Sequence, residues 1–220
     1  MIDYAQARRT MVDCQIRPAD VTDRALLAAM LDIPRERFLP SHLAGLAYLD
    51  LDLPLAGPRH NPTRRLIKPQ VLAKLLQAAE ITDADRVLDV GCATGYSSAV
   101  LARLANSVVA LEEDAELLRL ARAELMKTGN IEIVRGPLIA GWPSRAPYDA
   151  IVLNGATEIT PEGLLEQLAD GGRLVGVFGR GQSAKAMLFR RVNGVLSSWP
   201  IFDAAAPLLP GFVAAPAFVF

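Results

Sequence analysis

The sequence is poor in cysteine and histidine, and this scarcity excludes several kinds of site. Its 220 residues include two cysteines, Cys14 and Cys92, and two histidines, His42 and His60. Two cysteines argue against a disulfide-stapled secreted scaffold. The sequence also has no cluster of residues with metal-ligand spacing, so we expect no metal site.

The chain also lacks a net charge of either sign and a long apolar run. Lys and Arg total 23 and Asp and Glu total 24, which leaves no global field to attract nucleic acid or an acidic membrane. No apolar run approaches the roughly 20 residues that span a bilayer, and the N-terminus does not resemble a signal peptide. We therefore expect a cytoplasmic protein, a monomer or small homo-oligomer, with no nucleic-acid or membrane partner.

The first eighty residues have the pattern of helices and loops. Thr22 is a candidate cap for the second helix, and the Pro-rich, polar stretch 50–66 predicts a loop that is long for a compact domain. Pro69 suits the first turn of the third helix, because its missing N–H would have no partner there. The expected helices cover 5–17, 22–31 and 69–80.

From Arg86 onward, short apolar runs alternate with helical segments. Such alternation predicts a doubly wound, mostly parallel sheet with helices on both faces. Asn193-Gly194 lies between two apolar runs and predicts a closing antiparallel hairpin. The expected strands are 86–91, 107–112, 131–136, 148–155 and 172–179, and the expected helices are 96–104, 115–127 and 161–168.

The most informative stretch is the turn Gly91-Cys92-Ala93-Thr94-Gly95, between a buried strand and a helix that begins at Tyr96. Small residues let a ligand approach the backbone, and the helix start offers unpaired N–H groups. Glu112 ends the next strand, where a carboxylate can accept hydrogen bonds from both hydroxyls of a ribose. This layout is typical of nucleoside binding, although a glycine-rich connection with no ligand would look similar.

The spacing of the turn separates two kinds of nucleoside cofactor. Gly91-x-Ala93-x-Gly95 is followed by Tyr96 and lacks the third glycine of the dinucleotide fingerprint. This favours S-adenosylmethionine (SAM), which carries a carboxylate in place of a pyrophosphate. An NAD-dependent oxidoreductase remains the less favoured alternative.

These motifs resemble the class I SAM-dependent methyltransferases, and more closely the protein-L-isoaspartate O-methyltransferase family. The similar segments are MVDCQIRPADVTDRALLAAMLDIPRERFLP (11–40), VLDVGCATGYSSAVLARLA (87–105), APYDAIVLNGA (146–156) and LLEQLADGGRLVGVFG (164–179). The resemblance implies a seven-stranded, mostly parallel sheet with an antiparallel hairpin. It also implies a SAM-binding domain over 81–220 and an N-terminal helical extension over 1–80 that forms part of the substrate side.

The resemblance implies methylation of the α-carboxylate of L-isoaspartyl residues in damaged proteins or peptides. A carboxylate is already anionic at pH 7, so the reaction needs no general base. The enzyme has to hold oxygen, methyl and sulfur in line and exclude water. Two alternatives remain open: a methyltransferase of the same lineage with another acceptor, and a non-catalytic relative that binds SAM or a protein partner.

Two positions depart from the family pattern. Ile67 stands where the family has a Ser or Thr hydroxyl near the acceptor carboxylate, so the catalytic residue is unknown. Arg65 and Lys68 are candidates to orient the acceptor, with Thr63 and Arg64 as further possibilities. Pro137 replaces an acid that helps to hold the adenine, which would then need another partner.

Several single residues have two interpretations. Asp89 could bind the cofactor's amino group or cap loop amides, and Cys92 is better explained as a small loop residue than as a nucleophile. The basic cluster Arg59, His60, Arg64, Arg65 and Lys68 is either solvated or captures an anionic acceptor. The expected cofactor-binding residues are Asp89, Gly91, Cys92, Ala93, Gly95, Tyr96, Glu112, Glu113, Gly136, Pro137, Leu138 and Asn154.

Overall fold

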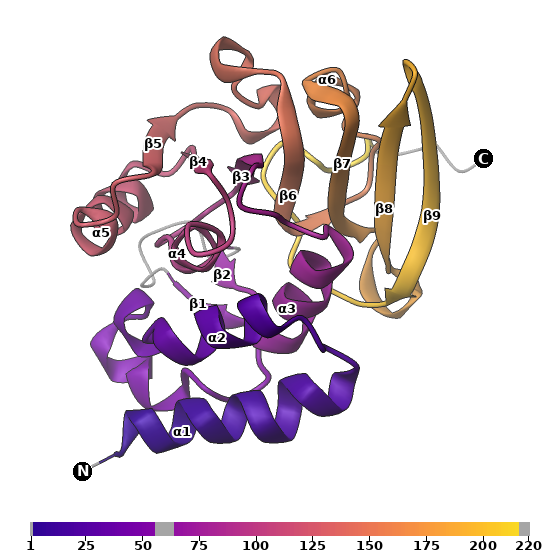
Figure 1. Cartoon of the computed structure of the whole chain (residues 1–220). Helices are drawn as coiled ribbons and strands as arrows, with labels where there is room; N and C mark the ends of the chain where they lie inside the picture. The colour runs from indigo at the N-terminus through magenta and orange to yellow at the C-terminus, as the bar shows by residue number, and fades with distance from the viewer. Residues whose placement is uncertain (1, 56–63, 216–220) are drawn as a thin grey trace.

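The computed structural model describes residues 2–55 and 64–215, and a seven-stranded sheet forms its centre (Figure 1). The strand order is β5-β4-β3-β6-β7-β8-β9, with the first five strands parallel and the last two antiparallel. This confirms the predicted doubly wound sheet with a closing hairpin. The strands are β3 (Arg86–Val90), β4 (Ser107–Glu112), β5 (Ile131–Arg135), β6 (Tyr148–Thr157), β7 (Leu168–Phe178), β8 (Lys185–Val192) and β9 (Val195–Asp203).

Helices cover the sheet and form the N-terminal region. The α-helices are α1 (Tyr4–Met11), α2 (Arg24–Asp32), α3 (Pro69–Ala78), α4 (Tyr96–Leu101), α5 (Ala115–Leu125) and α6 (Glu162–Leu165). A π-helical turn, Val12–Ile16, follows α1 directly. Short 3-10 helices lie at Arg17–Ala19, Arg35–Phe38, Ser41–Leu46, Leu138–Ala140, Pro143–Arg145 and Gly181–Ser183.

The two faces of the sheet contribute to two hydrophobic clusters, as the period-two alternation of strands requires. Val87 and Val108 point into the larger cluster, which also contains buried residues of α2, α3, α4 and α5. Leu88 and Val109 point to the opposite face, where α6 and the C-terminal segment pack. The larger cluster joins the N-terminal helices directly to the sheet, and Figure 1 shows α1 and α2 as a layer on that side.

The proline-rich stretch contains more regular structure than the sequence predicted. β1 (Leu53–Pro54) and β2 (Arg65–Leu66) pair as a small antiparallel ladder, with Leu53 opposite Leu66. Leu55 N–H also donates to the carbonyl of Arg64 at 3.1 Å. Residues 56–63 of the predicted loop, which include Arg59, His60 and Thr63, lie outside the described residues.

Three other boundary predictions need correction. Asp23, not Thr22, caps α2, because its carboxylate accepts from Leu26 N–H at 3.0 Å. The helix expected over 161–168 is limited to α6, since β7 begins at Leu168 and pairs there with Tyr148. β6 also extends two residues beyond its predicted end, to Thr157.

After β9 the chain returns to the sheet and runs beside the carboxyl end of β6, where Leu208 forms a parallel bridge with Ala156. Ala156 N–H donates to the carbonyl of Pro207 at 2.7 Å, and Leu209 N–H donates back to the carbonyl of Ala156 at 2.9 Å. Gly155 permits this approach, because a Cβ there would lie 2.7 Å from Leu209 Cγ. Leu209 and Phe212 are consequently buried beside the sheet.

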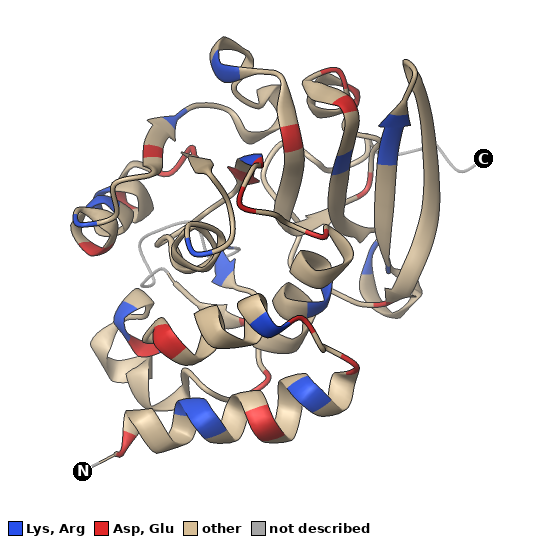
Figure 2. Ribbon diagram, viewed as in Figure 1, with Lys and Arg blue, Asp and Glu red and all other residues tan. Residues whose placement is uncertain are grey.

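Charges of both signs are interspersed over the fold, as Figure 2 shows along α1 and α2. Among the described residues, no helix is both long and apolar enough to cross a bilayer. The absence of a nucleic-acid partner and the oligomeric state stay predictions.

Candidate active site at the glycine turn

The turn between β3 and α4 needs backbone conformations that favour glycine. Gly91 has φ +74° and Gly95 has φ +97°, while Ala93 between them adopts φ +55°. Gly95 N–H donates to the carbonyl of Cys92 at 2.8 Å and closes the turn. The Thr94 hydroxyl donates to the carbonyl of Phe38 at 2.7 Å, so the N-terminal region fixes the turn from outside the sheet.

Three polar side chains lie on the same face of three neighbouring strands. Asp89 of β3 pairs in register with Ala110 of β4 and with Val152 of β6. Because side chains alternate along a strand, Glu112 and Asn154 lie two residues further along the same face. The sheet thus brings together three of the predicted cofactor-binding residues beside the glycine turn.

Asp89 is fully buried and held by the first turn of α4. Its carboxylate accepts from the Ser97 hydroxyl at 2.8 Å and the Ser98 hydroxyl at 2.5 Å, and from the side-chain amide of Asn154. Burial raises the pKa of Asp89 to about 6, although these hydrogen bonds oppose the shift. In this structure Asp89 therefore anchors the start of α4 and the middle of β6, an alternative to the predicted contact with a cofactor.

Glu112 is the centre of a second network at the end of β4. Within the described residues, one carboxylate oxygen accepts from Ala93 N–H at 2.9 Å and from the guanidinium of Arg64. The other accepts from Glu113 N–H at 3.0 Å and Asp114 N–H at 3.1 Å. Glu112 is completely buried, and its carboxylate holds the turn and the start of α5 together.

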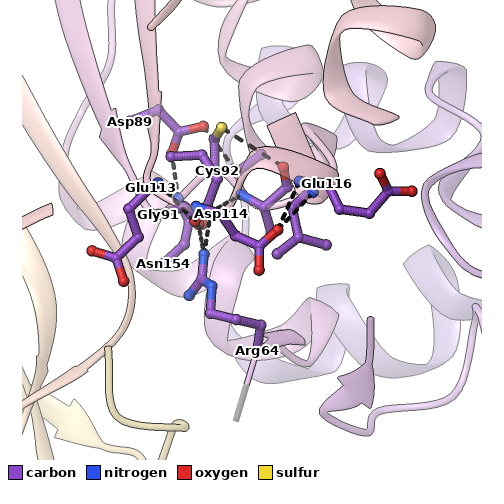
Figure 3. A network of polar contacts seen from close by, with 12 residues as sticks. Arg64, Asp89, Gly91, Cys92, Glu113, Asp114, Glu116 and Asn154 are labelled. Atoms are coloured by element: carbon purple, nitrogen blue, oxygen red, sulfur yellow. Dashed lines mark hydrogen bonds and ion pairs between the residues drawn. The ribbon is translucent and has the colours of Figure 1, made fainter. Parts of the chain in front are cut away.

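Arg64 is the site residue whose position the sequence did not predict. The sequence predicts a basic cluster here that is solvated or captures an acceptor, whereas the structure shows Arg64 3% exposed and paired with Glu112. Its Nη2 also donates to the carbonyl of Gly91 at 3.2 Å, and Figure 3 shows the side chain reaching into this network. The sequence offers no signal for it, because Arg64 and Arg65 are adjacent arginines and only the structure separates buried Arg64 from exposed Arg65.

Side chains of this chain cover the turn on the side of Gly91. A Cβ at Gly91 would lie 3.0 Å from Leu209, 3.3 Å from Arg64 Nη2 and 3.5 Å from Leu138. The cavity between the turn and Ile67 has a volume of about 10 Å³. That is room for one water, whereas sites for small organic ligands measure a few hundred Å³.

The residue chemistry nevertheless fits SAM. Glu112 offers a carboxylate at a strand end, and the turn offers a glycine backbone without side chains. In this structure the side chains of Arg64 and Leu209 occupy the space beside Gly91. Among the described residues, no cluster of His, Cys, Asp and Glu could hold a metal ion.

The remaining predicted cofactor residues occupy different places around the turn. Gly136 N–H donates to the carbonyl of Glu112 at 3.3 Å, which brings the segment with exposed Pro137 and buried Leu138 beside the site. Glu113 is partly exposed beside Glu112. Tyr96 is fully buried, with its ring 5.6 Å from that of Phe38 and 4.7 Å from the guanidinium of Arg35.

Cys92 is buried within the turn itself. Burial is the main cause of a pKa of its thiol that is well above the ordinary value, and the nearby carboxylates of Asp89 and Glu112 add to the shift. A thiol that stays protonated is a poor nucleophile. This environment agrees with the interpretation of Cys92 as a small loop residue.

The candidate acceptor side contains Ile67 and its neighbours. Ile67 is buried, and its carbonyl accepts from Arg35 Nη2 at 2.7 Å. Arg65 is exposed and donates to the carbonyl of Asp52 at 3.2 Å. Lys68 donates its backbone N–H to the Asp52 carboxylate at 2.9 Å, so that carboxylate holds the entrance to α3.

The comparison with family models decides the relationship of this chain. Residues 6–199 match the model described as protein-L-isoaspartate(D-aspartate) O-methyltransferase. The chain belongs to this family. The resemblance inferred from the sequence motifs is thereby confirmed, although Ile67 and Pro137 depart from the family pattern as noted.

Curated relatives and solved structures agree with this membership. Protein-L-isoaspartate O-methyltransferase 1 of Rhodopseudomonas palustris (strain HaA2) is 39% identical over 187 residues, 84% of this chain and 74% of the relative. The protein-L-isoaspartate O-methyltransferase of Methylorubrum extorquens (strain PA1) is 41% identical over 174 residues, 79% of this chain and 74% of the relative.

Two solved structures share the fold over most of the chain. A protein-L-isoaspartate O-methyltransferase superposes with a TM-score of 0.81 at 25% identity, over 93% of this chain and 66% of the neighbour. A Plasmodium falciparum structure described as a complex with S-adenosyl-L-homocysteine gives a TM-score of 0.75 at 17% identity, over 90% of this chain and 96% of the neighbour. The second likeness shows the shared fold.

Proposed function

We propose that this protein is a SAM-dependent protein-L-isoaspartate O-methyltransferase. Glu112 is the observation that carries the proposal, since a buried carboxylate ends β4 beside a glycine turn. Family membership supports both the cofactor and the acceptor. The product of such an enzyme is a methyl ester. Attack of the backbone nitrogen on the ester carbonyl expels methanol and closes a succinimide, and hydrolysis of the succinimide gives back part of the normal aspartate, which makes the activity a repair of damaged proteins.

The cofactor's ribose would bind to Glu112 and its methionine portion would lie along the turn from Gly91 to Gly95. Leu138 and Gly136 border the same space and would contact the adenine. Pro137 offers no N–H or side-chain acceptor, so the adenine amino group would need a backbone carbonyl. Asp89 and Asn154 would support the turn through α4 and β6.

Methyl transfer from SAM to a carboxylate needs no general acid or base from the protein. The acceptor carboxylate is anionic at neutral pH and the sulfonium of SAM is positively charged. One carboxylate oxygen forms a bond to the methyl carbon while the methyl–sulfur bond breaks, and its electron pair stays on sulfur. The residues around the turn have to align these atoms and exclude water.

Methyl transfer to a matched peptide pair tests this function. One peptide contains L-isoaspartate at a single position, and its twin contains L-aspartate there. With labelled SAM, the proposal expects base-labile label on the isoaspartyl peptide and at least tenfold less on the twin. Equal labelling, or no labelling of either peptide by a chain that binds SAM, would contradict the proposed substrate.

Ile67 motivates a second candidate, the same methyl transfer to a different acceptor. The side chain is buried and provides no hydroxyl to an incoming carboxylate. A panel of small carboxylic acids and peptides in the same assay separates the two candidates. Label on another acceptor, with none on the isoaspartyl peptide, would favour the second.

The proposal extends to the roles of the two regions of the chain, the cellular location and the oligomeric state. Residues 1–80 would form the substrate side, supported by the position of Ile67 at the small cavity beside the turn. Residues 81–220 would form the cofactor-binding domain. A cytoplasmic location fits Cys14 and Cys92, which are both unpaired thiols. A measurement of molecular mass in solution would decide between a monomer and a small homo-oligomer.

A further inference from the structure

Arg64 differs from the other described basic residues of this site in combining burial with a contact to the glycine turn. Among the described basic residues nearby, Arg65 is exposed, Lys68 uses its backbone at Asp52, and buried Arg35 donates to the carbonyls of Ala47 and Ile67. Arg64 is buried with its guanidinium against the backbone of the turn. Its Nη2 lies 3.2 Å from the carbonyl of Gly91. Gly91 also lines the small cavity that Ile67 borders, so Arg64 and the position of the missing hydroxyl both lie beside Gly91.

The hydrogen bonding of Arg64 is incomplete. Nη2 contacts Glu112 and the Gly91 carbonyl, but Nε is buried with no acceptor among the described residues. A buried donor without a partner is costly, and native proteins retain few of them. Its presence beside a ligand-binding turn points to a missing acceptor, and a planar guanidinium pairs best with a carboxylate.

Arg64 and the ribose compete for the same group. The Glu112 oxygen that would accept from a ribose hydroxyl already accepts from Arg64 and from Ala93 N–H. When the ribose takes over Glu112, the guanidinium loses its carboxylate. A buried, unpaired cation is strongly unfavourable, so a second anion is needed nearby.

We propose that Arg64 is the residue that orients the acceptor: cofactor binding releases it from Glu112, and it then pairs with the isoaspartyl α-carboxylate in place of the absent hydroxyl at Ile67. This proposal rests on the proposed function. It makes Arg64 a substrate-binding residue that is stored on Glu112 while the cofactor is absent. The cofactor then binds first, and the acceptor completes the exchange.

The charges balance through the reaction. Before transfer, Arg64 faces a carboxylate anion and the methyl donor is a cation. Transfer yields a neutral ester and a neutral thioether, so Arg64 loses its anionic partner. Return of Arg64 to Glu112 then competes with the ribose and favours release of the spent cofactor.

The exchange predicts a measurable coupling between two ligands. S-adenosylhomocysteine should raise the affinity of the protein for the isoaspartyl peptide, and the peptide should raise its affinity for S-adenosylhomocysteine by the same factor. A charge-assisted hydrogen bond corresponds to a factor of about ten to one hundred in affinity. We therefore expect at least tenfold coupling in the wild-type protein, measured by calorimetry with each ligand alone and with the other saturating.

Three variants test the role of Arg64. Arg64→Gln should reduce the coupling to less than twofold and raise the peptide KM about tenfold or more, with kcat changed less. Arg64→Lys keeps the charge without the planar fork and should recover part of both values. Arg103→Gln is the matched control, because it removes an arginine from an exposed pair with Asp32 and should leave the coupling and KM unchanged.

The outcomes separate this inference from the proposed function. Absence of transfer by the wild-type protein would contradict the proposed function itself. Wild-type transfer without coupling, or an Arg64→Gln peptide KM equal to that of Arg103→Gln, would overturn the role of Arg64. If Arg64→Gln fails to fold, Arg64→Lys decides: a KM and coupling equal to wild type would contradict the need for the guanidinium fork.

Discussion

Among the residues that the structure describes, two buried arginine–carboxylate pairs lie at opposite ends of the sheet, and they are built differently. Arg173 of β7 pairs with Asp85 at the amino ends of the strands, and all three of its nitrogens are used. Nε donates to the carbonyl of Ala79, while the other two nitrogens reach Asp85 and the carbonyls of Asp149 and Glu80. This pair locks α3 against the sheet.

The pair at the carboxyl ends of the strands is less complete. Arg64 and Glu112 are at least as deeply buried, yet Arg64 Nε has no acceptor among the described residues. The pair lies against the glycine turn, where the ligand of a doubly wound sheet is expected. The satisfied guanidinium of Arg173 fits a structural pair, and the unsatisfied Nε of Arg64 at the ligand-binding edge supports the proposal that this pair exchanges partners.

Asp85 and Asp89, which lie at the two ends of β3, also differ in the direction in which their pKa values are shifted. Burial alone would raise the pKa of Asp85, but the hydrogen bonds from Arg173 and from Thr82 N–H outweigh it, and the pKa is below its ordinary value. Asp89, near Glu112, accepts hydrogen bonds from Ser97, Ser98 and Asn154, which are all uncharged, and burial keeps its pKa raised, at about 6. At the amino end of the sheet the surroundings thus stabilise the charged form of Asp85. At the carboxyl end the surroundings disfavour the charged form of Asp89.

The largest effect should come from breaking the structural pair. Arg173→Ala leaves Asp85 without its cation and removes hydrogen bonds to three carbonyls, so the free energy of unfolding should fall by about 3–5 kcal/mol. Urea denaturation measures this loss. Below the unfolding transition, SAM affinity should stay within about threefold of wild type. A larger change in SAM affinity would contradict the view that the Arg173–Asp85 pair is structural and independent of the ligand site.

Asp89 should make stability depend on pH. Its folded pKa of about 6 exceeds the usual value, so the folded state binds the proton more tightly. Its contribution is therefore greatest below about pH 4 and is lost as the pH rises through about 6, by about 3 kcal/mol. The difference in unfolding free energy between wild type and Asp89→Asn should fall over this range. A flat difference would show that Asp89 titrates normally.

Glu112→Gln should weaken SAM binding. The amide keeps the size of the side chain but loses a charged acceptor for the ribose, so affinity should fall by about 1.5–3 kcal/mol. Calorimetric titration with SAM measures the change, and Glu132→Gln on exposed β5 serves as the control. Unchanged affinity in the Glu112 variant would contradict the assignment of the ribose.

Ile67→Ser should have the smallest effect. It restores the family's hydroxyl and should raise kcat/KM for the isoaspartyl peptide by the value of one neutral hydrogen bond, about 0.5–1.5 kcal/mol. Steady-state kinetics on the folded variant measures it. If Ile67→Ser raises kcat/KM neither in the wild-type protein nor in the Arg64→Gln variant, the hydroxyl position does not face the acceptor.

Local patterns in the sequence predicted most of the fold and half of the candidate site. The turn from Gly91 to Gly95 and the acid Glu112 lie in one strand–helix–strand unit, so their proximity follows from short-range spacing. Asn193-Gly194 likewise forms the predicted hairpin between β8 and β9. Such features depend on backbone preferences that neighbouring residues express directly.

Long-range packing determined what the sequence did not predict. Arg64 reaches Glu112 across 48 positions, and Leu209 reaches Gly91 from the far end of the chain. Neither contact has a spacing or periodicity that points to its partner. The basic residues 59–68 looked like one cluster, yet burial separates Arg64 from exposed Arg65.

The most direct test follows Arg64 and Arg173, the two buried arginines that pair with carboxylates among the described residues, in one NMR spectrum of the ¹⁵N-arginine-labelled protein, with Arg64→Lys used for assignment. Saturating S-adenosylhomocysteine should shift the Nε–H signal of Arg64, because the ribose takes over Glu112. The signal of Arg173 should stay in place. Binding of the ligand with an unchanged Arg64 signal would contradict the account, and so would a shift of equal size at Arg173.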